Sequence, residues 1–399
     1  MVFNAKNAVY NGGPFQSYWW ADEHEPIHPA IRVSLKDPIN EDMIKEAWEK
    51  LKGHYPLIDC IADDYDEEIL FFKGEGESVP IKTDHIPRIA GEAIKNRGFV
   101  LTFFENTLTL SAYHSLADEI GLMHLVSELL TAYFTKKNRG ETGSQTDEVS
   151  ARPEEYFVQN TMLSPTDFKP QTLVLYHDIA NIFMDPKTGN DEKGINTGSL
   201  IFPAGSFEKI CDKYNISADE MMILVMAKAV HRLFPEERRA LSFGVMTDFR
   251  GTFDMKKTIA PCSKRMPLVL EYEDVIQREE HLAKQIAEKR AIQTSDDYIK
   301  SHVALENSYA VLNIRNVCTN INYAGCLNIG EFTSEICGVS VSDYSANTLF
   351  LVKSGERIYV SMQYGKETDR YMTAARNVLT ELGINDIYRG KAYRIEGEH

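Results

Sequence analysis

The chain has 399 residues, of which 43% are hydrophobic and 10% aromatic, and its formal net charge at pH 7 is −16. This length and apolar content predict a globular protein of two lobes or domains. The negative charge argues against nucleic acid or an anionic membrane as the main partner. An anionic small molecule could still bind through a local basic patch.

Six cysteines are scattered without the CxxC or CxxH spacing of a zinc site, and they suggest no disulfide framework. Residues 1–15 contain no apolar signal core, and the best apolar run, "MMILVMA", is far too short to span a bilayer. We therefore expect a cytoplasmic, reduced protein without membrane insertion. No P-loop, dinucleotide fingerprint or metal cluster is recognisable, so neither a bound metal nor a bound redox cofactor is predicted.

The first half of the chain shows alternating strands and amphipathic helices in turn. We predict a strand at 30–36, a helix at 40–56, strands at 57–64 and 67–74, a hairpin at 98–114 with its turn at 105–107, and a helix at 118–134. Residues 135–155 are polar and rich in turn formers, which predicts a loop or linker.

A second polar stretch, 185–198, precedes the elements of the second half. We predict a strand at 199–203, a helix at 205–215, a helix at 217–234 that opens with a Ser217–Glu220 capping box, a strand at 240–250, a hairpin at 348–364 with its turn at Ser354-Gly355, and a helix at 370–383. The order hairpin, polar elbow, helix thus occurs twice, about 250 residues apart. This repetition suits two lobes built on one plan, which we place at 1–180 and 181–399.

Only the first elbow carries a histidine. His114 ends an apolar strand and is followed four residues later by Asp118, where a helix N-cap belongs. Two interpretations remain open from this pattern alone. His114 is either a chemical group held at a cleft or an ordinary turn residue, and Asp118 is in the second case simply the cap.

The segment "YHSLADE" resembles the HHxxxDG motif of the condensation-domain and chloramphenicol-acetyltransferase-like superfamily, which includes free-standing alcohol acetyltransferases. Other segments match in the same order along nearly the whole chain: "PFQSYWWADE", "LKGHYPLIDC", "VMTDFRG" and "TNINYAGCLNIG". The resemblance implies an α/β fold of two chloramphenicol-acetyltransferase-like lobes, a V-shaped pseudo-dimer with an interlobe tunnel. It also implies direct acyl transfer, without an acyl-enzyme.

Carried onto this sequence, the resemblance makes His114 the catalytic base that accepts a proton from the acceptor hydroxyl or amine. Asp118 then has a structural role, and Arg250 in "TDFRG" is the expected partner of its carboxylate. Ser263 and Asn320 fall in segments that face the tunnel in the family, where they could donate hydrogen bonds to the substrate or an oxyanion.

Three departures from the family pattern stand out. Tyr113 replaces the first motif histidine, Glu119 replaces the glycine, although Gly121 lies two residues on, and the glycine- and tryptophan-rich second motif of the plant branch is absent.

A basic cluster could hold the phosphates of coenzyme A or of a carrier protein's pantetheine arm; alternatively it is a solvated face. It comprises Lys256, Lys257, Lys264 and Arg265.

The sequence therefore predicts an acyltransferase that moves an acyl group from a pantetheine thioester, on coenzyme A or a carrier protein, to a small hydroxyl or amine acceptor. We expect a monomeric pseudo-dimer. Two alternatives stay open. One is a free-standing condensation enzyme that forms an amide from carrier-bound substrates, and the other is a non-catalytic relative that keeps the fold as a binding or scaffold module, which Glu119 favours and the intact His114 and Asp118 oppose.

Overall fold

The structure is a computed structural model of the chain. It describes residues 10–11, 28–65, 68–74, 78–85, 97–114, 116–139, 182–188, 195–255, 258–300, 317–343, 347–390 and 393–395. The N-terminal segment "PFQSYWWADE" and the two lysines at 256 and 257 lie outside the described residues. No helix among the described residues has both the length and the apolar character needed to cross a membrane.

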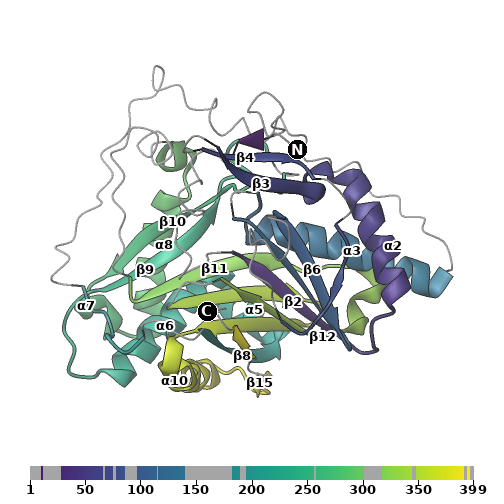
Figure 1. Ribbon diagram of the computed structural model, residues 1–399. Coiled ribbons are helices and arrows are strands. Elements are labelled where there is room, and N and C mark those ends of the chain that lie inside the picture. Colours follow the sequence, from purple (N-terminus) through teal and green to yellow (C-terminus); the bar gives the residue numbers. More distant parts are fainter. Residues whose placement is uncertain are drawn as a thin grey trace.

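Two main sheets organise the molecule, and Figure 1 shows them side by side. The smaller has five strands in the order β12 (Ile336–Ser342), β2 (Ala30–Leu35), β7 (Thr107–Ala112), β6 (Phe99–Phe104) and β5 (Ile81–Lys82). Helices α2 (Glu41–His54) and α3 (Glu119–Arg139) accompany this sheet, and they share its apolar core. A separate three-stranded sheet joins β1 (Tyr10–Asn11), β4 (Glu68–Lys73) and β3 (Cys60–Tyr65), and the short η3 (Pro56–Asp59) leads into it.

The larger sheet is built almost wholly from the second half of the chain. Its order is β10 (Ser263–Leu270), β9 (Leu241–Asp248), β11 (Thr319–Cys326), β13 (Thr348–Ser354), β14 (Arg357–Gln363), β8 (Ile195–Pro203) and β15 (Tyr388–Arg389), with β16 (Tyr393–Ile395) also paired to β8. The accompanying helices are α5 (Ala204–Tyr214), α6 (Ala218–Leu233), α7 (Tyr272–Val275), α8 (Glu279–Gln293) and α10 (Thr368–Glu381), with η6 (Gly330–Glu335) and η7 (Gly365–Glu367) as short turns.

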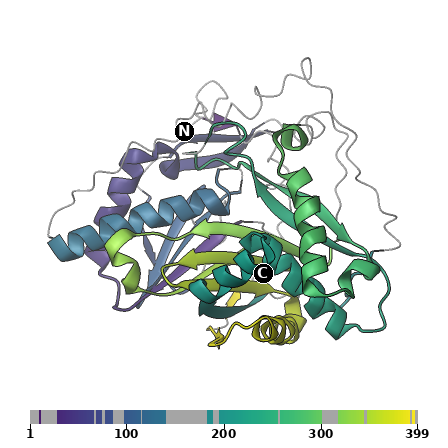
Figure 2. The same ribbon diagram turned by 180° about the vertical axis from the view of Figure 1, so that it is seen from behind.

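Each sheet has its own apolar core. In the second, α6 is buried on nearly every side and packs between the sheet and α10. Figure 2 shows α10, in yellow, below the sheet and α3, in blue, above it. The predicted capping box is present at the start of α6: Ser217 accepts a bond from the Glu220 backbone N–H, and the Glu220 carboxylate accepts one from the Ser217 N–H. Two orphan N–H groups of the first turn are thereby satisfied.

The repeated hairpin, elbow and helix are both present, in different sheets. β6, β7 and α3 form the first copy, and β13, β14, η7 and α10 form the second. The flanking order also agrees, because β2-β7-β6 and β8-β14-β13 are each antiparallel triplets. One strand crosses the expected division at 180/181: β12 comes from the second half and pairs with β2 along its whole length.

Several predicted boundaries differ from the structure. Residues 57–59 belong to a 3₁₀ turn instead of a strand, because the chain turns at Pro56 before β3 begins. Helix α3 continues through Thr135–Arg139, which we expected to be linker, and β8 begins at Ile195, inside the predicted polar loop. In both cases charged or polar residues continue a helix or strand that packs through its other residues, so the polar composition does not mark the end of the element. Several elements were not predicted: β1, β5, β10, α7, α8, β11, β12, β15 and β16.

Candidate active site

His114 lies two residues beyond the end of β7, in a tight turn that leads to α3. The Tyr113 N–H donates to the Gly98 carbonyl at 2.7 Å, and the Leu116 and Ala117 N–H groups donate back to the Tyr113 carbonyl at 2.8 and 3.2 Å. These bonds fix the backbone on both sides of His114. The histidine side chain is buried, with 8% of its surface exposed. The turn therefore fixes where the backbone places the buried imidazole.

Asp118 is the N-cap of α3 and also the centre of a wider network. One carboxylate oxygen, Oδ1, accepts a bond from the Gly121 N–H at 2.9 Å, which is the capping bond. The other, Oδ2, accepts bonds from the Cys262 N–H at 3.0 Å and the Ser263 hydroxyl at 2.9 Å. Both expected features of Asp118 are thus present at once, since it caps the helix and pairs with Arg250.

Arg250 uses its whole guanidinium in this network. Nη2 donates to Asp118 Oδ1 at 2.7 Å and Nη1 to Asp118 Oδ2 at 3.1 Å, so the pair is bidentate. The remaining N–H groups donate to the Thr258 and Ala260 carbonyls and to the Asp248 carboxylate. Asp118 is fully buried and Arg250 nearly so. The expected ion pair therefore exists, and it joins the elbow of the first sheet to the end of β9 in the second.

The protonation of this pair follows from its surroundings. Burial alone would raise the pKa of the Asp118 carboxyl, but the Arg250 charge and the bonds from Arg250, Gly121 and Cys262 outweigh it and hold that pKa below its usual value. Burial likewise works against the charge of Arg250, yet Asp118 raises the pKa of the guanidinium overall. Both groups are therefore charged at neutral pH.

Glu119 is the first residue of α3 and is itself buried, with 2% of its surface exposed. Burial is the main cause that raises the pKa of its carboxyl; the nearby carboxylates of Asp343 and Asp118 raise it further, and His114 acts in the opposite direction. Asp343, at the end of β12, is also buried. The elbow thus gathers one imidazole and several carboxyl groups. No sequence motif pointed to Asp343, because its neighbourhood depends on β12 crossing to the first sheet.

Gly121 explains how α3 can approach the second half so closely. A Cβ atom at this position would lie 2.1 Å from the Ile259 carbonyl oxygen and 2.8 Å from its carbon. Only glycine leaves room for that backbone. Glu119 occupies the position of the motif glycine. Gly121, two residues further on, is the glycine that allows this close contact.

Two of the other candidate residues have defined partners. The Ser263 hydroxyl donates to Asp118, so in this structure it braces the elbow instead of offering its proton to a ligand. Asn320, on β11, is buried, and its Nδ2 lies 3.4 Å from Thr348 Oγ1. Of the basic cluster, Lys264 is half-buried and Arg265 exposed, both on β10 at the edge of the large sheet.

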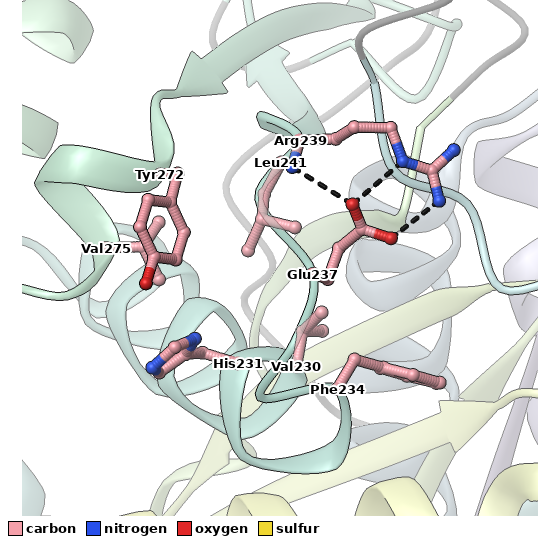
Figure 3. Close-up of a pocket in the computed structure, with 8 residues that line it drawn as sticks. All are labelled: Val230, His231, Phe234, Glu237, Arg239, Leu241, Tyr272 and Val275. Atoms are coloured by element: carbon pink, nitrogen blue, oxygen red, sulfur yellow. Dashed lines mark hydrogen bonds and ion pairs between the residues drawn. The ribbon is translucent and has the colours of Figure 1, made fainter.

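A separate small pocket lies in the second half of the chain, between α6, β9 and α7. Figure 3 shows the side chains that line it. Glu237 there forms an ion pair with Arg239, and His231 packs against the edge of Tyr272. The pocket holds about 10 Å³, roughly the space of a single water. It is too small for a thioester substrate. Within the described part of the chain, no three His, Cys, Asp or Glu side chains gather as a metal site requires.

No protein-family model matches the chain, and no curated protein matches it in sequence. Solved structures do match it over nearly its whole length. Polyketide synthase associated protein 5 from Mycobacterium tuberculosis has 11% identity and a TM-score of 0.68, covering 96% of this chain and 99% of its own. A trichothecene 15-O-acetyltransferase from Fusarium sporotrichioides has 10% identity and a TM-score of 0.63, covering 96% and 97%.

The first condensation domain of the calcium-dependent antibiotic synthetase is also similar, with 12% identity, a TM-score of 0.60 and coverage of 95% and 96%. At such identities the likeness concerns the fold. The chain therefore has the two-lobe α/β fold shared by condensation domains and chloramphenicol-acetyltransferase-like acyltransferases, as expected from the sequence. The V shape and the interlobe tunnel stay predictions.

Proposed function

We propose that the protein is an acyltransferase in which His114 is the general base. The observation that carries this proposal is the elbow itself. A histidine held by backbone bonds follows β7, and the bidentate Asp118–Arg250 pair ties its turn to the second half of the chain. Such bracing fixes a catalytic side chain within the narrow tolerance that proton transfer demands.

In the proposed reaction, an acyl group passes from a pantetheine thioester to a hydroxyl or amine of a small acceptor. The His114 imidazole accepts the acceptor's proton as the acceptor oxygen or nitrogen attacks the thioester carbonyl. When the tetrahedral intermediate collapses, the C–S bond breaks and the imidazolium returns the proton to the sulfur, which leaves as the thiol. Transfer is direct, so no acyl-enzyme forms. The reaction would occur in a tunnel between the lobes, with Asp118 and Arg250 in a structural role and Asn320 at its wall.

The donor thioester would be carried by coenzyme A or a carrier protein, and Lys264 and Arg265 at the sheet edge offer positive charge for its phosphates. Lys256 and Lys257 remain candidates for the same task. Ser263 is no longer proposed as a donor to the substrate, since its proton is used by Asp118.

The direct test measures thiol release from acyl-coenzyme A thioesters of increasing chain length, with a panel of alcohols and amines as acceptors. His114→Ala should lower turnover by roughly 10²–10⁴-fold, the usual contribution of a positioned base. His85→Ala is the matched control, because the His85 side chain is 77% exposed. Wild-type turnover in the His114→Ala variant with an aliphatic alcohol would overturn the catalytic role.

Two other functions remain as candidates, each favoured by an observation. The similarity to a condensation domain favours amide formation between carrier-bound substrates, which the same assay detects if a loaded carrier protein replaces coenzyme A. The buried Glu119 favours a non-catalytic binding module, because its carboxylate would add negative charge beside a developing oxyanion. Absence of thiol release with every donor would support that second candidate.

A further inference from the structure

A buried carboxyl group lies one residue beyond the braced Asp118, at the position where the family motif has glycine. Glu119 is the first residue of α3, and its side chain is buried. Glutamate is almost never fully buried in a folded protein unless its charge has a partner. Because glycine has no side chain, this buried carboxyl is a feature that the chain adds to the motif.

The turn before α3 brings His114 and Glu119 close together. Two N–H groups within the turn donate to the Tyr113 carbonyl, so the backbone coils once around this point, and the helix begins with Asp118 as its N-cap. Both the imidazole of His114 and the carboxyl of Glu119 are buried, and the two groups interact electrostatically. The carboxyl is therefore held beside the imidazole at the start of α3.

The other carboxylate of the turn is committed elsewhere. Both oxygens of Asp118 bind Arg250, and Oδ2 also accepts bonds from the Cys262 N–H and the Ser263 hydroxyl. These partners all come from the second half of the chain. The negative charge of Asp118 is thus balanced by Arg250, which leaves Glu119 as the carboxyl of the turn without such a counter-charge.

The end of β12 contributes a third carboxyl group on the same side of the first sheet. Val341 packs in the core that this sheet shares with α3. Residues two apart on an extended chain point to the same face, so Asp343 is directed toward the start of α3. It is buried there. Burial is the main cause that raises the pKa of the Glu119 carboxyl, and the charge of Asp343 raises it further.

The charges of Glu119 and His114 are linked through these surroundings. Burial and the carboxylates of Asp343 and Asp118 favour the neutral form of Glu119, whereas a protonated His114 favours its carboxylate form. Such coupling is reciprocal, so an ionised Glu119 stabilises the imidazolium form of His114 to the same extent. Among the described residues, the charged groups around the pair are Asp118 with its partner Arg250, from α3 and the end of β9, and Asp343, from the end of β12.

We propose that Glu119 is a positioning residue whose carboxylate stabilises the imidazolium formed when His114 accepts the acceptor's proton. The inference deepens the proposed function and rests on it for the proton transfer. The acceptor's O–H or N–H bond breaks as its C–O or C–N bond forms. The proton stays on His114 until the C–S bond breaks, and it then moves to the sulfur. Glu119 exchanges no proton with the substrate.

This role resembles that of the aspartate in a Ser-His-Asp triad, which stabilises the imidazolium without becoming protonated. The negative charge of Glu119 would oppose a developing oxyanion, but it favours a developing imidazolium. Ionising a buried carboxyl costs folding free energy. Glu119 therefore exchanges some stability of the folded chain for a stronger base.

The first measurement needs no turnover. It follows the titration of the His114 imidazole by NMR in protein labelled at its histidines, where the His114 signal is the one missing from the spectrum of His114→Ala. Glu119→Gln should lower the midpoint of this titration by roughly 1 pH unit, because it removes an anion beside the imidazolium. Glu356→Gln is the matched control, since Glu356 is exposed in the turn between β13 and β14 and should leave the midpoint unchanged.

Two further variants separate charge from shape. Glu119→Asp keeps the charge and should keep the midpoint near that of the wild type. Glu119→Gly restores the motif residue and lacks the carboxyl, so it should give the midpoint of Glu119→Gln. Melting temperatures of the same samples show that each variant is folded. A midpoint in Glu119→Gly equal to that of the wild type would contradict the inference.

The second measurement is turnover with an acyl-coenzyme A thioester and an aliphatic alcohol. Glu119→Gln should move the pH of half-maximal turnover downward with the NMR midpoint and lower the maximal rate by about 3- to 10-fold, since a weaker base accepts the proton less effectively. The KM for the thioester should not change, because Glu119 acts only on the imidazole. A merely structural role for Glu119 would lower the rate without moving the pH profile.

The two measurements distinguish failure of this inference from failure of the proposed function. An unchanged NMR midpoint in Glu119→Gln would show that Glu119 has no charge to offer His114, and the inference is then wrong whatever the turnover. A shifted midpoint with an unshifted pH profile would also overturn it. A shifted midpoint in a protein that releases no thiol from any donor would keep the pairing of Glu119 with His114 and overturn only the proposed activity.

Discussion

The Asp118 carboxylate and the Arg250 guanidinium meet across 132 positions of sequence and form two parallel hydrogen bonds, of 2.7 and 3.1 Å, with both side chains buried. This pair fastens the start of α3, in the first half, to the end of β9, in the second. Breaking the pair should lower the free energy of unfolding of the whole protein, because both groups are buried and water cannot replace the lost hydrogen bonds.

Asp118→Asn should destabilise the protein by up to about 3–5 kcal/mol, the usual cost of breaking a buried ion pair, because the partly exposed Asp248 carboxylate stays beside Arg250 and offsets part of the loss. Asparagine keeps the shape and one acceptor but removes the charge that Arg250 needs. The measurement is urea unfolding at neutral pH. Asp37→Asn is the control, because Asp37 forms an exposed ion pair with Lys137 at 2.8 Å and should change stability little. Equal effects in the two variants would show that the buried pair contributes nothing special.

The same pair predicts a dependence on acidity. The pKa of the Asp118 carboxyl is lowered in the folded state, so its contribution is fully present above the unfolded value, near ~3.9, and is lost as pH falls through the folded value. The stability difference between wild type and Asp118→Asn should therefore be constant from neutral pH to about pH 5 and shrink in stronger acid. Unfolding curves at a series of pH values provide the check, and a difference that grows on acidification contradicts it.

Glu119 should behave in the opposite sense. The pKa of its buried carboxyl is raised, so the folded state loses stability as pH rises above the unfolded value, near ~4.3, and the carboxyl ionises. Glu119→Gln should then be more stable than wild type at pH 8 and show no gain below about pH 4. The groups that face this carboxyl are His114, Asp343 and Asp118. Thermal unfolding of both proteins across this range measures the gain; a gain independent of pH would mean that ionisation is not its cause.

Gly121→Ala should destabilise the protein by roughly 1–3 kcal/mol, as overpacking of a close contact does. The added methyl group would lie 2.1 Å from the Ile259 carbonyl oxygen, which is backbone and cannot rotate away. Gly205→Ala is the matched control. Gly205 lies in α5 with no atom within 4 Å of the added carbon, so the substitution should be neutral or slightly stabilising. Denaturant midpoints of the two variants distinguish a steric effect at 121 from a general glycine effect.

Much of the fold and part of the site could be predicted from the sequence. Alternation and helical spacing predicted β2 and α2, because each is half-buried with one apolar face. The two hairpins were predicted from apolar runs interrupted by a turn, and their strands are buried on both faces. The pairing of Asp118 with Arg250 was predicted through the family resemblance, since nothing local links two residues so distant. The two-lobe α/β fold was predicted through the same resemblance.

Features that depend on long-range packing could not be predicted. The proximity of Asn320 and Gln363 on the large sheet is one example, because the two residues are brought together only by the register of β11, β13 and β14. The hydrogen bond from Ser263 to Asp118 is another, since the hydroxyl reaches the carboxylate from the opposite half of the chain. The position of β12 beside β2 is a third, as local pattern says nothing about which sheet a strand joins.

The pairing of β12, from the second half of the chain, with β2, from the first, has a consequence for synthesis on the ribosome. Ala30 pairs with Ser342 and Leu35 with Ile336, so β2 must wait for roughly 300 further residues before its outer edge is covered. At bacterial or eukaryotic rates of about 5–20 residues per second, this interval lasts roughly 15–60 s. Throughout it the strand presents unpaired backbone groups to neighbouring nascent chains. A chaperone therefore has this edge to protect during most of synthesis, and a slow or stalled translation of the last third would leave it open to a strand from another molecule.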